Sequence, residues 1–128
     1  MILLDENIIA TQRLILHGWR MRHQQIGIEV AKAGISDGDI VRLLHTLRLV
    51  TFFTRDKAFY DRSLCHRKYC LVHLRVEAYE VASFVRRLLS HTEFDTWAKR
   101  RGRVVQTSPA GIRCWTPHGE AELAFSWA

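Results

Sequence analysis

The chain has 128 residues, a length that suits one compact domain with a hydrophobic core. Hydrophobic residues make up 48% of it and charged residues 25%, which excludes general disorder. The 19 Lys and Arg residues outnumber the 13 Asp and Glu residues and give a formal charge of +6. This charge suits a polyanionic partner such as RNA or DNA, although a merely basic surface would have the same composition.

No part of the sequence indicates export or membrane insertion. Asp5 and Glu6 interrupt the N-terminal apolar run before it could form the core of a signal peptide. No window approaches the ~18 uncharged apolar residues that span a bilayer. The three cysteines, Cys65, Cys70 and Cys114, have neither disulfide-framework nor zinc spacing. We therefore expect a cytoplasmic protein with free thiols.

The first part of the chain predicts a strand, a helix and a weaker second strand. Met1–Leu4 is an apolar run of the length of a short buried strand. Apolar residues then recur at helical spacing, which predicts a helix over Asn7–His17 that ends at Gly18. Ile26 and Ile28 indicate a second strand.

The middle of the chain continues this alternation. Ser36 is a suitable N-cap for a helix with one apolar face. That face is formed by Ile40, Leu43, Leu44 and Leu47. A β-branched and aromatic run predicts a central strand at Leu49–Phe53, followed by a loop at Thr54–Lys57. Another strand is expected at Tyr69–Leu74 and another helix at Ala78–Ser90.

The alternation of strand and helix implies an α/β domain whose mostly parallel sheet is covered on both faces. The pattern changes in the last part of the chain. Phe94–Lys99 predicts a short helix, and Arg103–Gln106 with Ile112–Thr116 predicts a β-hairpin. We therefore expect a single domain with a core over residues 1–91 and a hairpin appendage over 92–128.

Acidic residues follow two of the predicted strands. Asp5 comes directly after the first strand and Asp56 follows the Leu49–Phe53 strand, so both fall at the carboxyl edge where α/β sheets bind ligands. Asp39 lies in the first turn of the helix that leads into the second of these strands. Clustered carboxylates repel one another unless a cation lies between them, and Mg²⁺ or Mn²⁺ prefers such oxygen ligands. The pattern predicts a metal site that activates water for attack on a phosphodiester.

Each acid also has a purely structural interpretation. Asp37 is better explained as complementing the positive end of its helix, and Asp39 could complete a capping box. Asp56 could be a turn residue, and Asp5 could cap the following helix. The arrival of three acids at one edge favours the metal site over three separate coincidences.

Three blocks of the sequence, in this order, resemble the PIN-like family. They are Ile2-Leu3-Leu4-Asp5-Glu6-Asn7, Gly34-Ile35-Ser36-Asp37-Gly38-Asp39-Ile40 and Val50-Thr51-Phe52-Phe53-Thr54-Arg55-Asp56-Lys57-Ala58-Phe59. The resemblance is to short PIN-like proteins that begin with LLDEN, many of which are bacterial toxins similar to the VapC group. It covers residues 1 to about 90. It implies a three-layer α/β/α fold, a metal-dependent endoribonuclease, RNA as substrate and a cognate antitoxin as partner; homodimerisation is left open.

The resemblance also implies roles for individual residues. The metal-binding and catalytic acids correspond to Asp5, Asp39 and Asp56, with Asp37 as the substitute for Asp39. Thr54 corresponds to the threonine beside the metal, where its hydroxyl could hold a water or a phosphate oxygen. Asn7 belongs to the opening motif and could orient Asp5 or contact substrate.

This chain departs from the family at one position. Members often carry a second Asp two residues after the first in the third block, and here that residue is Ala58. Asp61 is the nearest acid that could replace it. The alternative hypothesis is therefore a catalytically silent PIN-like module that binds RNA or a protein partner. A nuclease acting on DNA, or a generic phosphodiesterase, is a third option.

Cations accompany the acids. The cations Arg55, Lys57, Arg62, Arg67 and Lys68 flank Asp56 in the sequence and are predicted to attract the phosphate backbone of the substrate. Arg55 and Lys57 are the two that we expect to bind it directly. The run Lys99–Arg103 could bind nucleic acid or an acidic partner, although such runs are often solvated turns. The seven histidines show no paired ligand spacing and are interpreted as structural or surface residues.

Overall fold

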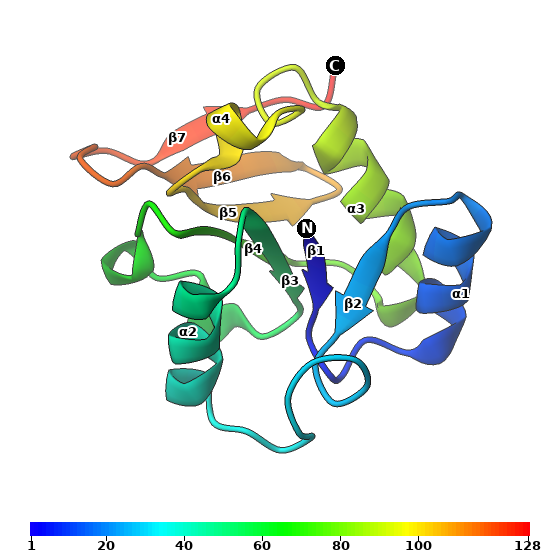
Figure 1. Cartoon of the computed structure of the whole chain (residues 1–128). Helices are drawn as coiled ribbons and strands as arrows, with labels where there is room; N and C mark the ends of the chain where they lie inside the picture. The colour runs from blue at the N-terminus through cyan, green and yellow to red at the C-terminus, as the bar shows by residue number, and fades with distance from the viewer.

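The computed structural model describes residues 1–128 and is built on one seven-stranded sheet (Figure 1). The strand order is β2-β1-β3-β4-β5-β6-β7. Neighbouring strands from β2 to β5 pair in parallel, whereas β6 and β7 are added antiparallel. The strands are β1 (Ile2–Leu4), β2 (His23–Gln25), β3 (Val50–Thr54), β4 (Tyr69–Leu74), β5 (Val104–Ser108), β6 (Gly111–Trp115) and β7 (Leu123–Phe125).

Helices cover both faces of the sheet and make the fold a three-layer α/β/α arrangement. The helices are α1 (Ala10–Gly18), α2 (Asp37–Thr46), α3 (Val81–Ser90) and α4 (Trp97–Arg100), with short 3₁₀ turns η1 (Lys57–Phe59), η2 (Arg62–Leu64) and η3 (Ala78–Glu80). Figure 1 shows α1 and α3 together on one side of the sheet and α2 on the other. None of these helices has the length and apolar character needed to cross a bilayer.

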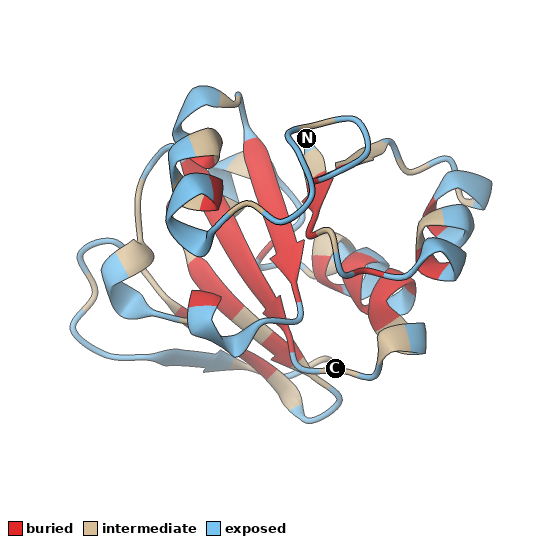
Figure 2. Ribbon diagram, turned by 90° about the horizontal axis from the view of Figure 1, so that it is seen from below, coloured by how far each residue is buried: buried red, intermediate tan, exposed pale blue.

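The central strands are buried on both faces, as the sequence predicts (Figure 2). Successive side chains of a strand point to opposite faces, so each strand contributes to two cores. Leu4 and Phe53 pack with α1 and α3, whereas Leu3 and Phe52 pack with α2. Ser36 caps α2 as expected, because its Oγ accepts a hydrogen bond of 3.1 Å from the Asp39 N–H.

Several element boundaries differ from the predictions. Helix α1 begins at Ala10 rather than Asn7, because the Asp5 carbonyl accepts the Ile8 N–H and turns the chain before the helix starts. The second strand is β2, upstream of the predicted Ile26 and Ile28. Gly27 follows with φ of 87°, a left-handed conformation that turns the chain away from the sheet.

The C-terminal segment is not an appendage. The predicted hairpin exists as β5 and β6, but β5 also pairs in parallel with β4 over Leu71–Leu74. Val104, Val105 and Phe94 are fully buried, so residues of this segment complete both cores. The sheet therefore continues through the whole chain.

The strand order places a topological switch point between β1 and β3. The chain leaves β1 toward β2 on one side and later returns to pair β3 on the other side. At such a point the connections that follow the two strands diverge and leave a crevice at the carboxyl edge. Asp5 follows β1 at this edge, and Arg55 and Asp56 follow β3.

Candidate functional site

A row of polar side chains crosses the carboxyl edge of the sheet. The β1–β3 register places Asp5 beside Thr54, and the next strands pair Thr54 with His73 and His73 with Gln106. Residues in register lie on the same face of a sheet. The row therefore joins four neighbouring strands, β1, β3, β4 and β5, at their carboxyl ends.

Thr54 connects the two acids that the sequence analysis singles out at this edge. Its Oγ1 donates a hydrogen bond of 2.6 Å to Oδ2 of Asp5 and accepts one of 3.0 Å from the Asp56 N–H. Oδ1 of Asp5 accepts the Glu6 N–H at 2.8 Å. Oδ1 of Asp56 accepts the Ala58 N–H at 2.9 Å, so Asp56 is also the cap of η1. Asp56 is therefore both a turn residue, as one interpretation predicted, and a residue at the carboxyl edge beside Asp5, as the other predicted.

The two carboxylates line one cavity of ≈290 Å³. Its other lining residues are Asn7, Ile8 and Arg55. The structure thus brings together four of the predicted site residues in a single concave site, and places the hydroxyl of the buried Thr54 against one of them.

A buried glutamine fixes the turn that carries Asp5. Nε2 of Gln25 donates to the carbonyl oxygens of Asp5 and Ile8, at 2.9 and 2.8 Å. Gln25 is fully buried in β2, and its Oε1 has no hydrogen-bond partner. The carboxylate of Glu6 accepts the Gly34 N–H and ties the Asp5 turn to the loop before α2.

The ionised form of Asp5 is electrostatically unfavourable at this position. Its side chain is buried, and this burial is the main reason that its pKa lies above the ordinary value. The carboxylates of Glu6 and Asp56 raise the pKa further, whereas the hydrogen bonds from Thr54 and the Glu6 N–H oppose the rise. A cation in this cavity would relieve the repulsion.

The other predicted acids do not join this pair. Asp39 forms an exposed ion pair with Arg42 on α2 and does not line the cavity. Asp61 caps η2, where its Oδ1 accepts from the Ser63 N–H and hydroxyl. Asp37 lies exposed in the first turn of α2. No group of three or more His, Cys, Asp or Glu side chains is placed to hold a metal ion.

The donor atoms at the cavity nevertheless fit a hard divalent cation. Asp5 and Asp56 supply carboxylate oxygens, and Asn7 supplies an amide oxygen at the same cavity. Mg²⁺ is commonly held by one or two carboxylates, with water and substrate phosphate completing its coordination. Asn7 is thus the third oxygen-bearing side chain that lines this cavity, and Asp39 is not among them.

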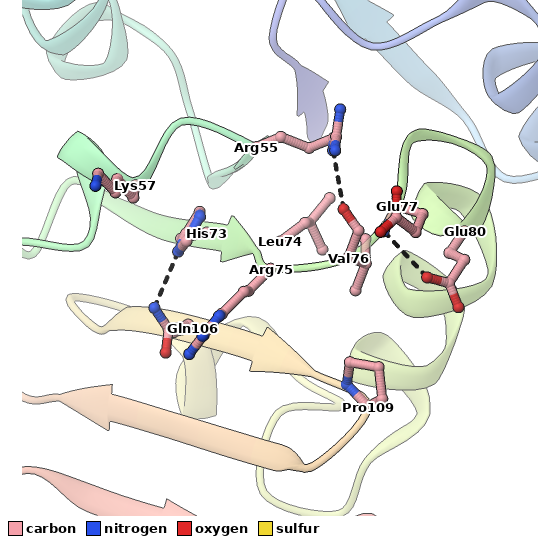
Figure 3. Close-up of a pocket in the computed structure, with 10 residues that line it drawn as sticks. All are labelled: Arg55, Lys57, His73, Leu74, Arg75, Val76, Glu77, Glu80, Gln106 and Pro109. Carbon is pink, nitrogen blue, oxygen red and sulfur yellow. Dashed lines mark hydrogen bonds between the residues drawn. The ribbon is translucent and has the colours of Figure 1, made fainter.

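Figure 3 shows the residues that line a wider groove of ≈640 Å³. This groove adjoins the cavity of the acid pair. Arg55 lines both the groove and the acid cavity, and Lys57 and Arg75 add two further cations. The Nε of Arg55 donates to the Val76 carbonyl at 3.0 Å, which directs its side chain along the groove. The groove can therefore receive a phosphate chain that enters the acid cavity.

The two acids that line this groove accept hydrogen bonds from backbone N–H groups. Glu77 and Glu80 form a capping box at the start of η3, in which the Glu77 N–H donates to Glu80 at 3.0 Å (Figure 3). Their carboxylates are thus oriented toward backbone N–H groups. Neither one forms an ion pair with the groove cations.

His73 also lines this groove, although its sequence position predicted only a structural or surface residue. It is buried at the floor of the groove, and its Nδ1 lies 3.1 Å from Nε2 of Gln106 (Figure 3). Burial lowers the pKa of His73, while the Arg55 backbone and the Asp56 carboxylate act in the opposite direction. A neutral His73 therefore lies beside the loop that carries Asp56. A histidine inside the otherwise apolar β4 run was the signal that could have revealed it.

Comparison of the chain with known protein families, with characterised proteins and with solved structures finds no match in any of the three.

Proposed function

We propose that this protein is a metal-dependent endoribonuclease of the PIN-like type. The observation that carries the proposal is the convergence of Asp5 and Asp56 on one cavity at the switch point of the sheet, joined by Thr54 and bordered by Arg55. Ligands of open α/β sheets bind at such switch points. The adjoining groove supplies the cations that a phosphate backbone requires.

Asp5, Asp56 and Asn7 would hold Mg²⁺ or Mn²⁺. Such an ion lowers the pKa of a bound water and stabilises charge on the phosphoryl oxygens. Thr54 keeps the Asp5 carboxylate in one orientation, and its hydroxyl proton is committed to Asp5, so the hydroxyl does not also donate to a phosphate oxygen. Arg55 and Lys57 bind phosphates on either side of the reacting group.

By the same proposal the protein acts in the cytoplasm as the toxin of a toxin–antitoxin pair. The sequence resemblance to short PIN-like toxins is the support for this part. An antitoxin that covers the groove around Arg55 would block access to the acid pair.

Cleavage of a mixed-sequence RNA with Mg²⁺ or Mn²⁺ tests the activity. We expect Asp5→Asn to reduce the rate at least about 100-fold, because the variant loses a metal ligand while remaining nearly isosteric. Asp39→Asn is the matched control, since Asp39 lies outside the cavity; it should cut at the wild-type rate. Retained cleavage by Asp5→Asn would overturn the proposal. A DNA of the same sequence, tested in parallel, shows whether the activity is specific to RNA.

The second candidate function is a catalytically silent module that binds RNA or a protein. Two observations favour it: Ala58 replaces an acid of the family pattern, and Asp39 is paired with Arg42 rather than placed at the cavity. A thermal-unfolding series separates the two functions. Millimolar Mn²⁺ should raise the Tm of the wild type but not of Asp56→Asn if the site holds metal. An unchanged Tm for both would favour the silent module.

A further inference from the structure

A second cluster of cations lies at the opposite edge of the sheet. Arg48 precedes β3, Arg67 and Lys68 precede β4, and Arg101 follows α4 just before β5. These residues line one cavity of ≈430 Å³. Because β3, β4 and β5 run parallel, the amino edge that they share is remote from the carboxyl edge that carries Asp5 and Asp56.

The positive charge of this cavity is uncompensated. Its four cations are exposed, no Asp or Glu lines it, and the three ion pairs of the chain lie elsewhere. The Nε of Arg101 donates to the Arg67 carbonyl at 3.2 Å, which holds two of the cations together. The pKa of the adjacent His66 is lowered by desolvation and by His45, Arg67 and Lys68, as expected beside an unneutralised positive field.

The residues of the basic run Lys99–Arg103 lie in different environments. Lys99 pairs with Asp95, and Arg100 points inward, where it donates to the Thr51 hydroxyl and the Phe94 carbonyl. Of this run, Arg101 alone lines the cavity. The cluster is thus assembled from three separate segments rather than from one solvated turn.

An aromatic surface accompanies these cations. Trp97 is half-buried: it packs against the core that includes α3, and it also lines the cavity. The imidazole of His45 lines the same cavity and packs edge-on to His66, with ring centroids 4.3 Å apart. Cations beside an aromatic ring are the combination with which proteins bind single-stranded nucleic acid, through phosphates and a stacked base.

We infer that this cavity is a second nucleic-acid site, which takes the phosphates and one base of a single strand at Arg48, Arg67, Lys68, Arg101 and Trp97. Four cations within one cavity fit successive backbone phosphates, and the Trp97 ring beside them offers a stacking surface that a base can use and a carboxylate side chain cannot. Its volume is within the ~300–1,000 Å³ of typical ligand sites, enough for a nucleotide unit. The site does not depend on catalysis at Asp5 and Asp56.

Binding of a fluorescein-labelled octauridylate, measured by anisotropy in EDTA, tests this inference. Arg67→Ala/Lys68→Ala should weaken binding at least about 10-fold and reduce its dependence on salt. The matched control is Arg13→Ala/Lys32→Ala, which also removes two cations, neither of which lines a described cavity or forms an ion pair. That control should bind like the wild type. Equal losses in the two double variants would overturn the site, since they would reflect net charge alone.

Three further measurements identify the ligand. Trp97→Leu should lower the affinity for octauridylate several-fold but leave binding of inorganic phosphate unchanged, because only the nucleotide can stack. The imidazole C2–H signal of His66, assigned with His66→Gln, should show a higher pKa when octauridylate or uridine monophosphate is bound. An unmoved His66 signal would overturn the site. Tighter binding of a polyglutamate peptide than of octauridylate would overturn the inference in favour of an acidic protein partner.

Discussion

Asp5 occupies a position at which its own charge is unfavourable for folding. The side chain is buried beside two other carboxylates, and these contacts hold its pKa above the ordinary value of 3.8. A buried carboxylate of this kind is typical of a functional site, because packing alone would select a neutral residue. The hydrogen bonds from Thr54 and the Glu6 N–H orient the carboxylate, but the pKa of Asp5 remains raised.

The pH dependence of stability should reveal this cost. The folded chain binds the Asp5 proton more tightly than the unfolded chain does, so the contribution of Asp5 to stability falls as pH rises from 3.8 through the raised pKa. Asp5→Asn removes this term. We expect the variant to match or exceed the wild-type Tm at pH 7, and to lose less stability than the wild type across that interval. Thermal unfolding from pH 4 to 7 measures both quantities.

The exposed Asp39 provides the comparison for this prediction. Asp39→Asn removes a carboxylate that is solvated and paired with Arg42, so its pH profile should follow that of the wild type. An Asp5→Asn profile as steep as the wild type would show that the hydrogen bonds to the carboxylate fully offset its burial.

The positions of the predicted acids in the structure show which parts of such a site can be predicted from a sequence. Asp5 and Asp56 were predictable because parallel strands place their carboxyl ends at one edge, whatever the details of packing. The position of Asp39 depends on the path of the loop over residues 26–36, and no local pattern encodes that path. Asn7 was predicted beside Asp5, but its place in the wall of the cavity shared by Asp5 and Asp56 became visible only in three dimensions.

At the scale of elements, the pairing of β5 with β4 makes the C-terminal segment part of the domain. The turn signals around Pro109 and Gly111 predicted its pairing with β6, which is a local contact. Its pairing with β4 joins residues more than thirty positions apart, and hydrophobic periodicity does not specify such partners. The sequence therefore predicted the hairpin correctly and its integration into the sheet incorrectly.

Paired substitutions test this integration. Val105 is fully buried in β5, whereas Leu123 in the edge strand β7 is 40% exposed. Val105→Asp places an unpaired carboxylate in the core and should cost at least about 4 kcal/mol or prevent folding, while Leu123→Asp should cost less than about 1 kcal/mol. Urea unfolding followed by circular dichroism measures both. A wild-type transition in Val105→Asp would mean that the core folds without β5.

At the scale of the whole molecule, charge is divided between two edges of one sheet. The carboxyl edge combines the acid pair with the groove cations, and the amino edge carries cations without acids. The acids Asp5, Asp56, Glu77 and Glu80 balance the cations at the carboxyl edge, so unbalanced positive charge is found at the amino edge of the two. Both edges belong to one continuous sheet, so their separation is fixed as long as that sheet stays intact.

Buried thiols provide a direct test of that continuity. Cys70 in β4 and Cys114 in β6 are fully buried within the same core, and burial raises the pKa of Cys70 to about 12 and also raises that of Cys114. Neither thiol can react with a disulfide reagent until the core opens.

If the chain unfolds as one unit, both thiols become reactive through the same global opening. We expect Cys65→Ser/Cys114→Ser, which leaves Cys70, and Cys65→Ser/Cys70→Ser, which leaves Cys114, to react at the same rate once corrected for stability. Both rates should increase with denaturant by the m-value of global unfolding. Faster reaction of Cys114 with a smaller denaturant dependence would instead mean that β6 and its neighbours open on their own. The cations of Arg101 and Arg67 would then not belong to a single rigid edge.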